Sequence, residues 1–102
     1  MKRIINGKIY NTETAERIGS YSRSNPSDFS YIDESLYRTK KGRFFIAGEG
    51  GAMTRYAESG SDGTWWGASG ICVLDDGEAL DWCESRGIDP DIVEQYFAIE
   101  EG

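Results

Sequence analysis

The stretch LYRTKKGRFFIAGEGG, residues 36–51, carries the strongest folding signal in the chain. Apolar and aromatic residues flank a short polar segment that ends in Gly42 and Arg43. A glycine at position 42 can adopt the positive φ that a tight turn with a bulge requires. We therefore predict that residues 36–39 and 43–46 pair as antiparallel strands around Gly42.

The glycine cluster at residues 48–51 raises the question of a phosphate-binding loop. A Walker-type loop would need glycine, lysine and a hydroxyl residue at positions 53–55, where the chain has MTR. A dinucleotide loop would need its third glycine at position 53, and Glu49 places a negative charge where an anion would sit. Both motifs fail, so we interpret Gly50 and Gly51 as residues that let the chain reverse after a core strand.

Further elements are indicated on both sides of this hairpin. Asn6-Gly7 between RII and KIY is typical of a two-residue type I′ turn, so the chain is predicted to begin with a β-hairpin. Residues 11–19 predict a short helix, and residues 71–75 predict a buried strand. The expected fold is a single α+β domain, residues 1–102, with a twisted antiparallel sheet of four to five short strands, a short N-terminal helix and two C-terminal helices.

The two C-terminal helices, at residues 77–86 and 91–98, have clear boundary signals. Asp75 and Glu78 have capping-box spacing, and Asp89 precedes Pro90 as the N-cap of the second helix. Apolar side chains then recur at helical spacing, which predicts a buried stripe at Ile92, Val93, Tyr96 and Phe97.

Composition disfavours several classes of function. Histidine is absent, which removes the commonest general base and most zinc sites. Cys72 and Cys83 are the only cysteines and are expected to be free thiols. The apolar runs are too short for a membrane span, and the basic N-terminus has no apolar signal core, so a cytoplasmic location in a host bacterial cell is expected. No catalytic, metal or cofactor-binding residue is predicted.

Charge is unevenly distributed along the chain. The 18 acidic and 11 basic residues give a net charge of −7. Residues 75–102 contain ten acidic residues and a single base, Arg86, which gives −9, whereas residues 1–74 carry +2. Such asymmetry indicates one electronegative face, which serves either solubility and helix capping or the binding of a basic partner.

The candidate partner-binding residues follow from this asymmetry and from aromatic positions. Asp81 and Glu84 lie three apart on one predicted helix, as do Asp91 and Glu94 on the next, and both pairs should face solvent. Neighbouring residues of a strand point to opposite faces, so one tryptophan of the Trp65-Trp66 pair is a candidate anchor and the other is expected in the core. Arg55 beside Tyr56 has two readings, a recognition pair, or a solvated or salt-bridged base beside a packed ring. The remaining candidate is Glu49.

An enzyme that acts through two carboxylates is a less favoured interpretation. Glu34, Glu49 and Asp62 could supply the two carboxylates of a glycoside hydrolase. Any acidic protein offers such pairs, however, and a cysteine nucleophile would lack a histidine partner.

Two segments, INGKIYNTETAE and LYRTKKGRFFIAGEGGAMTRYA, resemble a group of small uncharacterised bacterial proteins met in phage and mobile-element gene sets. The likeness covers about two-thirds of the chain, and its motifs are structural, so it implies no functional residues. In size, acidity and lack of catalytic residues the chain is also similar to anti-CRISPR proteins, which block CRISPR effectors by stoichiometric binding.

These observations favour a non-enzymatic anti-CRISPR or anti-defence inhibitor. Its expected partner is a protein such as a CRISPR effector with a basic nucleic-acid-binding surface, since carboxylates can meet the Lys and Arg side chains that otherwise bind phosphates. The alternative is a small accessory protein–protein interaction module of a phage or mobile element, and the third reading is a small carboxylate-based enzyme. Direct nucleic-acid binding is disfavoured by the net charge.

Overall fold

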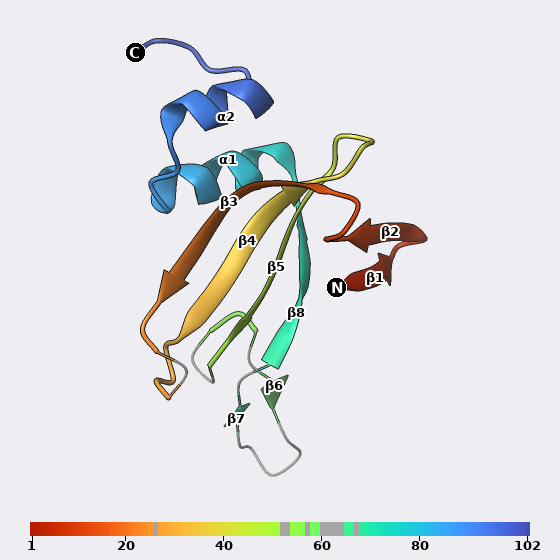
Figure 1. The fold of residues 1–102 in the computed structure, drawn as a ribbon, viewed down its shortest axis with the longest axis vertical. Helices are drawn as coiled ribbons and strands as arrows, with labels where there is room; N and C mark the ends of the chain where they lie inside the picture. Colours follow the sequence, from red (N-terminus) through yellow and green to blue (C-terminus); the bar gives the residue numbers. More distant parts are fainter. Residues whose placement is uncertain (26, 52–53, 57, 60–64, 67) are drawn as a thin grey trace.

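The computed structural model describes residues 1–25, 27–51, 54–56, 58–59, 65–66 and 68–102. It is an α+β fold in which two helices lie together beside a four-stranded antiparallel sheet (Figure 1). In chain order the elements are β1 (Lys2–Ile5), β2 (Lys8–Asn11), β3 (Glu16–Arg23), β4 (Ile32–Arg38), β5 (Phe44–Gly50), β6 (Glu58–Ser59), β7 (Trp65–Trp66), β8 (Ala68–Leu74), α1 (Asp76–Ser85) and α2 (Pro90–Tyr96).

The central hairpin predicted from residues 36–46 is confirmed. The main sheet has the order β3-β4-β5-β8, and every pairing in it is antiparallel. Leu36 lies opposite Ile46 and Arg38 opposite Phe44, while Gly42 in the turn has a φ of 85°. β1 and β2 form a separate two-stranded ribbon, and β6 pairs with β7.

The larger core lies between the main sheet and the helices. Alternate residues of β4 and β5 point toward the helices, so Leu36 and Ile46 are completely buried there. Ile18, Phe44 and Leu74 join them from the sheet. The helices contribute Ala79, Trp82, Cys83 and Val93.

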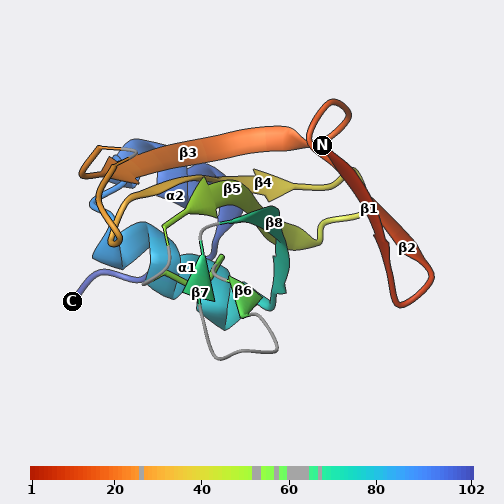
Figure 2. The same ribbon diagram turned by 90° about the horizontal axis from the view of Figure 1, so that it is seen from below.

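The opposite face of the sheet is covered only in part. Phe45 and Ala47 of β5 point to this face and pack with Tyr10 of the N-terminal ribbon. The rings of Tyr10 and Phe45 meet edge to face at 5.5 Å, and Tyr37 stacks on Phe45 at 5.2 Å. Figure 2 shows the ribbon projecting to one side of the main sheet. The ribbon and the helices therefore belong to different faces of the molecule.

The short N-terminal helix predicted at residues 11–19 is wrong. Asn11 accepts hydrogen bonds from the backbone N–H groups of Thr14 and Ala15 through its carbonyl and from Glu13 through its side chain, which makes a single turn. The chain then extends into β3, where Ile18 is buried against the helices. One apolar contact in the sheet outweighs weak helical signals, because a helix this short is not stable by propensity alone.

Both C-terminal helices are confirmed, each shifted by one or two residues from its predicted bounds. The Asp75 side chain accepts from the Glu78 backbone N–H at 2.8 Å, and the Glu78 side chain accepts from the Asp75 N–H at 3.0 Å. Asp89 caps α2, with Pro90 in its first turn. The Tyr96 hydroxyl donates to Glu16 at 2.6 Å, which fastens α2 to the start of β3.

We expect Phe97→Ala to lower the free energy of unfolding by about 3 kcal/mol. The Phe97 ring is partly buried and stacks on the buried Phe44 ring at 4.9 Å, so its removal leaves a cavity under α2. Denaturant unfolding measures the loss, and Phe29→Ala is the control, because the Phe29 side chain is 69% exposed. Equal stabilities of the two variants would show that Phe97 does not support the core.

Candidate functional site

The four carboxylates predicted to bind a partner are all exposed on the helices. We call Asp81 and Glu84 of α1 together with Asp91 and Glu94 of α2 the acidic helical surface. None of the four side chains makes an ion pair or hydrogen bond with another described residue. Glu84 and Glu94 line the same groove between the helices, whereas Asp81 lines a separate hollow beside Arg55 and Arg86.

Arg86, the only base in residues 75–102, does not neutralise this surface. Its Nη2 donates to Glu34 Oε1 at 3.2 Å, and its guanidinium carbon lies 4.1 Å from the centre of the Tyr21 ring. The Arg86 side chain is 18% exposed, and its positive charge is directed toward the sheet. The carboxylates on the outside of α1 and α2 are therefore left without a compensating base from their own segment.

Glu34 is the centre of a buried polar cluster that ties four segments together. Trp82 Nε1 of α1 donates to Glu34 Oε1 at 2.7 Å, and the Tyr56 hydroxyl donates to Glu34 Oε2 at 2.7 Å. Arg55 Nε lies 3.8 Å from the same Oε2 atom, and Arg86 Nη2 lies 3.2 Å from Oε1. Glu34 itself is 1% exposed. A single carboxylate thus joins β4 to α1, to the segment after β5 and to Arg86 in the turn after α1.

The electrostatics keep Glu34 ionised. Burial raises the pKa of its carboxyl group, but hydrogen bonds from Trp82 and Tyr56, the Arg55 charge and the Arg86 hydrogen bond outweigh it, so the pKa lies below its ordinary value. Burial and the bond to Glu34 raise the pKa of the Tyr56 hydroxyl. Both oxygens of Glu34 accept bonds from within the fold, so its role in this arrangement is to hold the four segments together.

The structure separates Glu34 from Glu49, two of the three carboxylates that the enzymatic reading would need together. Glu34 lies opposite Gly48, and Glu49 lies opposite Asp33 on the neighbouring strand, so the two carboxylates point to opposite faces of the sheet. Glu49 is exposed and accepts from the Tyr31 hydroxyl at 2.9 Å. The third carboxylate of that reading, Asp62, lies outside the described residues.

Of the other predicted partner-binding residues whose side chains are described, Arg55 lies near the acidic helical surface, in the hollow that Asp81 lines, and Glu49 does not. Glu49 lies on the sheet face away from the helices, and Arg55, which is 41% exposed, pairs with Glu34. The second reading of the Arg55-Tyr56 pair, a packed tyrosine beside a salt-bridged arginine, matches the structure. Trp65 and Trp66 form β7, but their side chains lie outside the described residues.

The predicted turn is right for Gly51 and wrong for Gly50. β5 continues through Gly50, and the turn begins at Gly51, whose carbonyl accepts from the Thr54 backbone N–H at 3.1 Å. Glycine is needed for close approach instead: a Cβ on Gly48 would collide with the backbone of Asp33 and Glu34, and one on Gly50 would collide with the Thr54 side chain. The small residues therefore make room for the Glu34 cluster and the segment that follows β5.

Both cysteines are free, as predicted; Cys72 is exposed on β8 and Cys83 is buried on α1. Among the described residues, no three His, Cys, Asp or Glu side chains are grouped as metal ligands. Within the same residues, neither helix has the length and apolarity to cross a bilayer.

No protein-family model matches the chain, and no curated protein or solved structure matches it.

Sequence reasoning missed the role of Glu34 as the buried centre of the molecule. Its signal was an acidic residue at an inward position of an alternating strand, between Ile32 and Leu36. A buried carboxylate requires hydrogen-bond donors around it. Trp82 on α1 and Arg86 at its C-cap are four residues apart, so they lie on the same side of the helix and could have been paired with Glu34 from the sequence.

Proposed function

We propose that the protein is a non-enzymatic inhibitor that binds a basic partner protein through the acidic helical surface. The partner that best fits is a nucleic-acid-binding effector, and an anti-CRISPR or related anti-defence role is the specific form of the proposal. An inhibitor of this kind occupies Lys and Arg side chains that would otherwise contact phosphates.

One observation carries the proposal: Arg86 turns inward onto Glu34, and every exposed charged side chain of α1 and α2 is a carboxylate. A helix usually gains stability from basic residues in its last turn, yet neither helix has one there. The helices of the acidic helical surface therefore lack the stabilising interaction between a basic side chain and the helix C-terminus. This is consistent with a surface that binds a basic partner. Glu84 and Glu94 facing one groove give this surface a fixed shape.

The alternative is a small accessory interaction module of a phage or mobile element with some other protein partner. The same surface would serve it, so identification of the partner separates the two. Affinity capture from cells that contain CRISPR effectors, followed by mass spectrometry, would recover an effector complex in the first case and an unrelated protein in the second.

We expect a fourfold amide variant, Asp81→Asn, Glu84→Gln, Asp91→Asn and Glu94→Gln, to lose partner binding without losing stability. Contacts to a desolvated basic channel are worth about 1–3 kcal/mol each, whereas exposed carboxylates contribute about 0–1 kcal/mol to folding. Binding of the captured partner is measured by calorimetry at rising salt, and wild-type affinity should fall as ionic strength increases.

A second fourfold variant controls for net charge. Glu13→Gln, Asp28→Asn, Asp33→Asn and Glu49→Gln remove the same number of charges from exposed positions outside the helices. This variant should bind like wild type. Salt-independent binding with a fully active helical variant would refute the electrostatic account, and the segment carrying Trp65 and Trp66 would become the preferred interface.

A further inference from the structure

The N-terminal ribbon, β1 and β2, has one packed face and one free apolar face. Ile5 and Tyr10 point toward the main sheet and join the Phe45 cluster. Ile4 and Ile9 lie directly opposite each other on the other face, where they are 72% and 61% exposed. Single exposed aliphatic side chains need no explanation, but a cross-strand pair on a projecting ribbon forms one continuous apolar spot.

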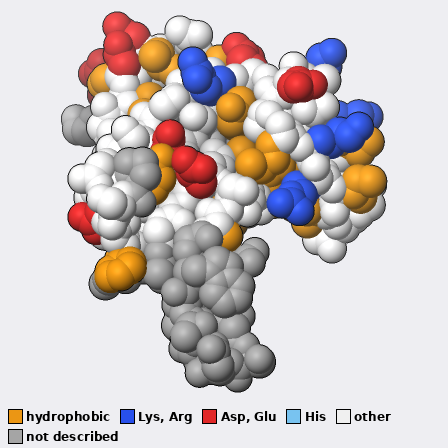
Figure 3. Space-filling view, turned by 60° about the horizontal axis from the view of Figure 1, so that its bottom comes forward, with side chains coloured by type: hydrophobic (Ala, Val, Ile, Leu, Met, Phe, Trp, Pro, Cys, Tyr) orange, Lys and Arg blue, Asp and Glu red, His pale blue; other side chains and the backbone are white. Residues whose placement is uncertain are grey.

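The ribbon is positively charged. Lys2 lies on the same face as Ile4 and Ile9, whereas Arg3 and Lys8 are exposed on the other face of the ribbon, beside Ile5 and Tyr10. Figure 3 shows basic and hydrophobic side chains intermixed on the side of the molecule where the ribbon lies. The ribbon thus presents an apolar pair with a lysine beside it, a surface suited to an apolar groove with an acidic rim.

The chain itself contains such a groove, between α1 and α2. The groove encloses about 370 Å³, and Glu84 and Glu94 supply its acidic rim. Ile99, which is 46% exposed, lies at its edge. Its apolar lining comes mainly from Leu80, Ile88 and Val93.

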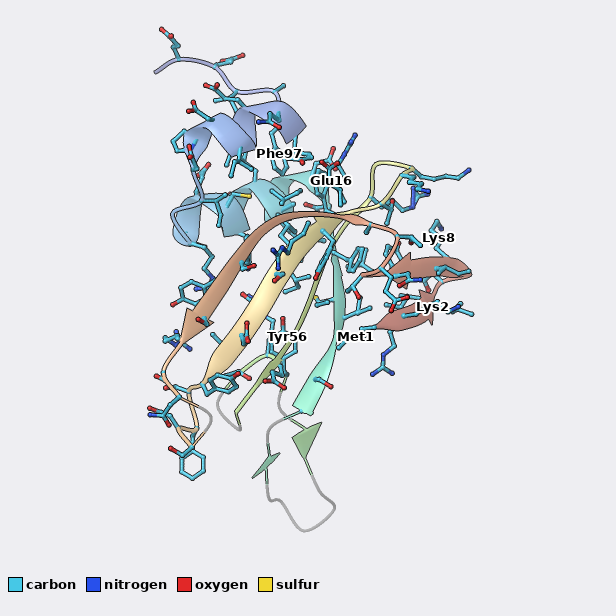
Figure 4. The ribbon with its side chains drawn as sticks, viewed as in Figure 1. Met1, Lys2, Lys8, Glu16, Tyr56 and Phe97 are labelled. Carbon is cyan, nitrogen blue, oxygen red and sulfur yellow. The ribbon has the colours of Figure 1, made fainter. Side chains whose placement is uncertain are left out.

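A molecule cannot fill its own groove with its own ribbon. Tyr10 holds the ribbon to Phe45 on one face of the sheet, whereas the groove belongs to the helices packed on the other face. Figure 4 shows Lys2 and Lys8 on the ribbon, apart from Phe97 in the helical layer. Any contact between the two surfaces is therefore between molecules.

We propose that the occupant of the groove is the ribbon of a second copy of this chain. Ile4 and Ile9 enter the apolar lining, and Lys2 on the same face of the ribbon meets the rim formed by Glu84 and Glu94. Because the contact joins two different surfaces, it closes into a dimer only when both molecules exchange ribbons, and otherwise it extends head to tail. The proposal goes beyond the inhibitor function, and a basic partner bound to the same rim would compete with self-association.

Sedimentation velocity of the purified protein, without any partner, tests this proposal. We expect the average mass to rise above the 11.4 kDa of one chain as concentration increases, and to fall back in about 0.5 M salt. Ile4→Thr with Ile9→Thr keeps β-branched residues in the ribbon and should weaken association at least tenfold. Circular dichroism confirms that the fold of this variant is intact.

A charge exchange makes the test specific for the proposed contact. Lys2→Glu, and separately Glu84→Lys with Glu94→Lys, should each weaken self-association at least tenfold. A mixture of these two variants should associate again, because the acidic side chain at position 2 of one variant faces the basic rim of the other.

A wild-type chain that stays at 11.4 kDa at every concentration would overturn the proposal, as would association that survives the Ile4 and Ile9 substitutions. Binding of the monomeric ribbon to duplex DNA or to anionic vesicles would equally overturn it and would assign the ribbon to that ligand. Since no partner protein is present, none of these outcomes bears on the inhibitor function.

Discussion

Glu34→Gln is expected to lower the free energy of unfolding by about 3–5 kcal/mol, since it breaks a buried ion pair by removing one partner. The glutamine oxygen can still accept from Trp82 and Arg86, the two donors that reach Oε1. Its NH₂ group would then lie beside the Arg55 guanidinium, which can only donate, and the Tyr56 hydroxyl would have to turn from donor to acceptor. The charge of Arg86 would then remain largely buried without its counter-ion.

Glu49→Gln is the matched control. Glu49 also accepts a tyrosine hydroxyl, from Tyr31 at 2.9 Å, and it lies on the strand next to Glu34, but its side chain is exposed. Its replacement should change stability by less than about 0.5 kcal/mol. Comparable losses of stability in both variants would show that burial and the arginine pairs do not increase the contribution of Glu34 to folding.

The pH dependence gives a second readout for Glu34. Because its pKa is depressed in the folded state, the wild-type chain gains stability from this group above the ordinary value of 4.5. That contribution is lost as pH falls through the lower, folded-state pKa. Denaturant unfolding from neutral to acidic pH should therefore show the difference between wild type and Glu34→Gln shrinking below about pH 4.5. A difference that stays constant would exclude an ionised Glu34.

The parts of the fold that sequence predicted are those governed by local chemistry. Positive φ angles occur in the Asn6-Gly7 turn, at 51° and 74°, and in the Gly42 turn. Asn and Gly are residue types that adopt such angles readily, so both turns can be recognised from the sequence. The capping box of Asp75 and Glu78 is likewise set within four residues. The helix predicted at residues 11–19 is wrong because of long-range packing: burial of Ile18 under the helices favours a strand there.

The candidate site was less predictable, because its net charge at the surface depends on the directions in which its charged side chains point. Exposure of Asp81, Glu84, Asp91 and Glu94 followed correctly from helical spacing. That Arg86 turns inward could not be read from the helix alone, since its partner is 52 residues away on β4. The local charge count therefore identified an acidic segment, but only the tertiary contact shows that its single base is withdrawn from the surface.

Gly48→Ala is expected to cost at least about 3 kcal/mol of stability, or to prevent folding altogether, because one added methyl group has no room. A Cβ at Gly48 would overlap the Asp33 carbonyl oxygen and the Cα and Cβ of Glu34, all of which are fixed by the β4–β5 pairing. Relief would require β4 to move and would pull Glu34 away from Trp82.

The chain supplies a matched control directly across the sheet. Gly70 of β8 lies opposite Gly48, yet a Cβ placed there meets no described atom within 4 Å. Gly70→Ala should therefore be neutral or should stabilise by about 0.4–1 kcal/mol, because alanine restricts the unfolded chain more than glycine does. Thermal and denaturant unfolding of the two variants compare the positions, and loss of a cooperative transition in Gly48→Ala counts as the expected result. If both alanines are tolerated equally, then the glycine cluster is not there to admit the buried carboxylate, and its conformational freedom becomes the better explanation.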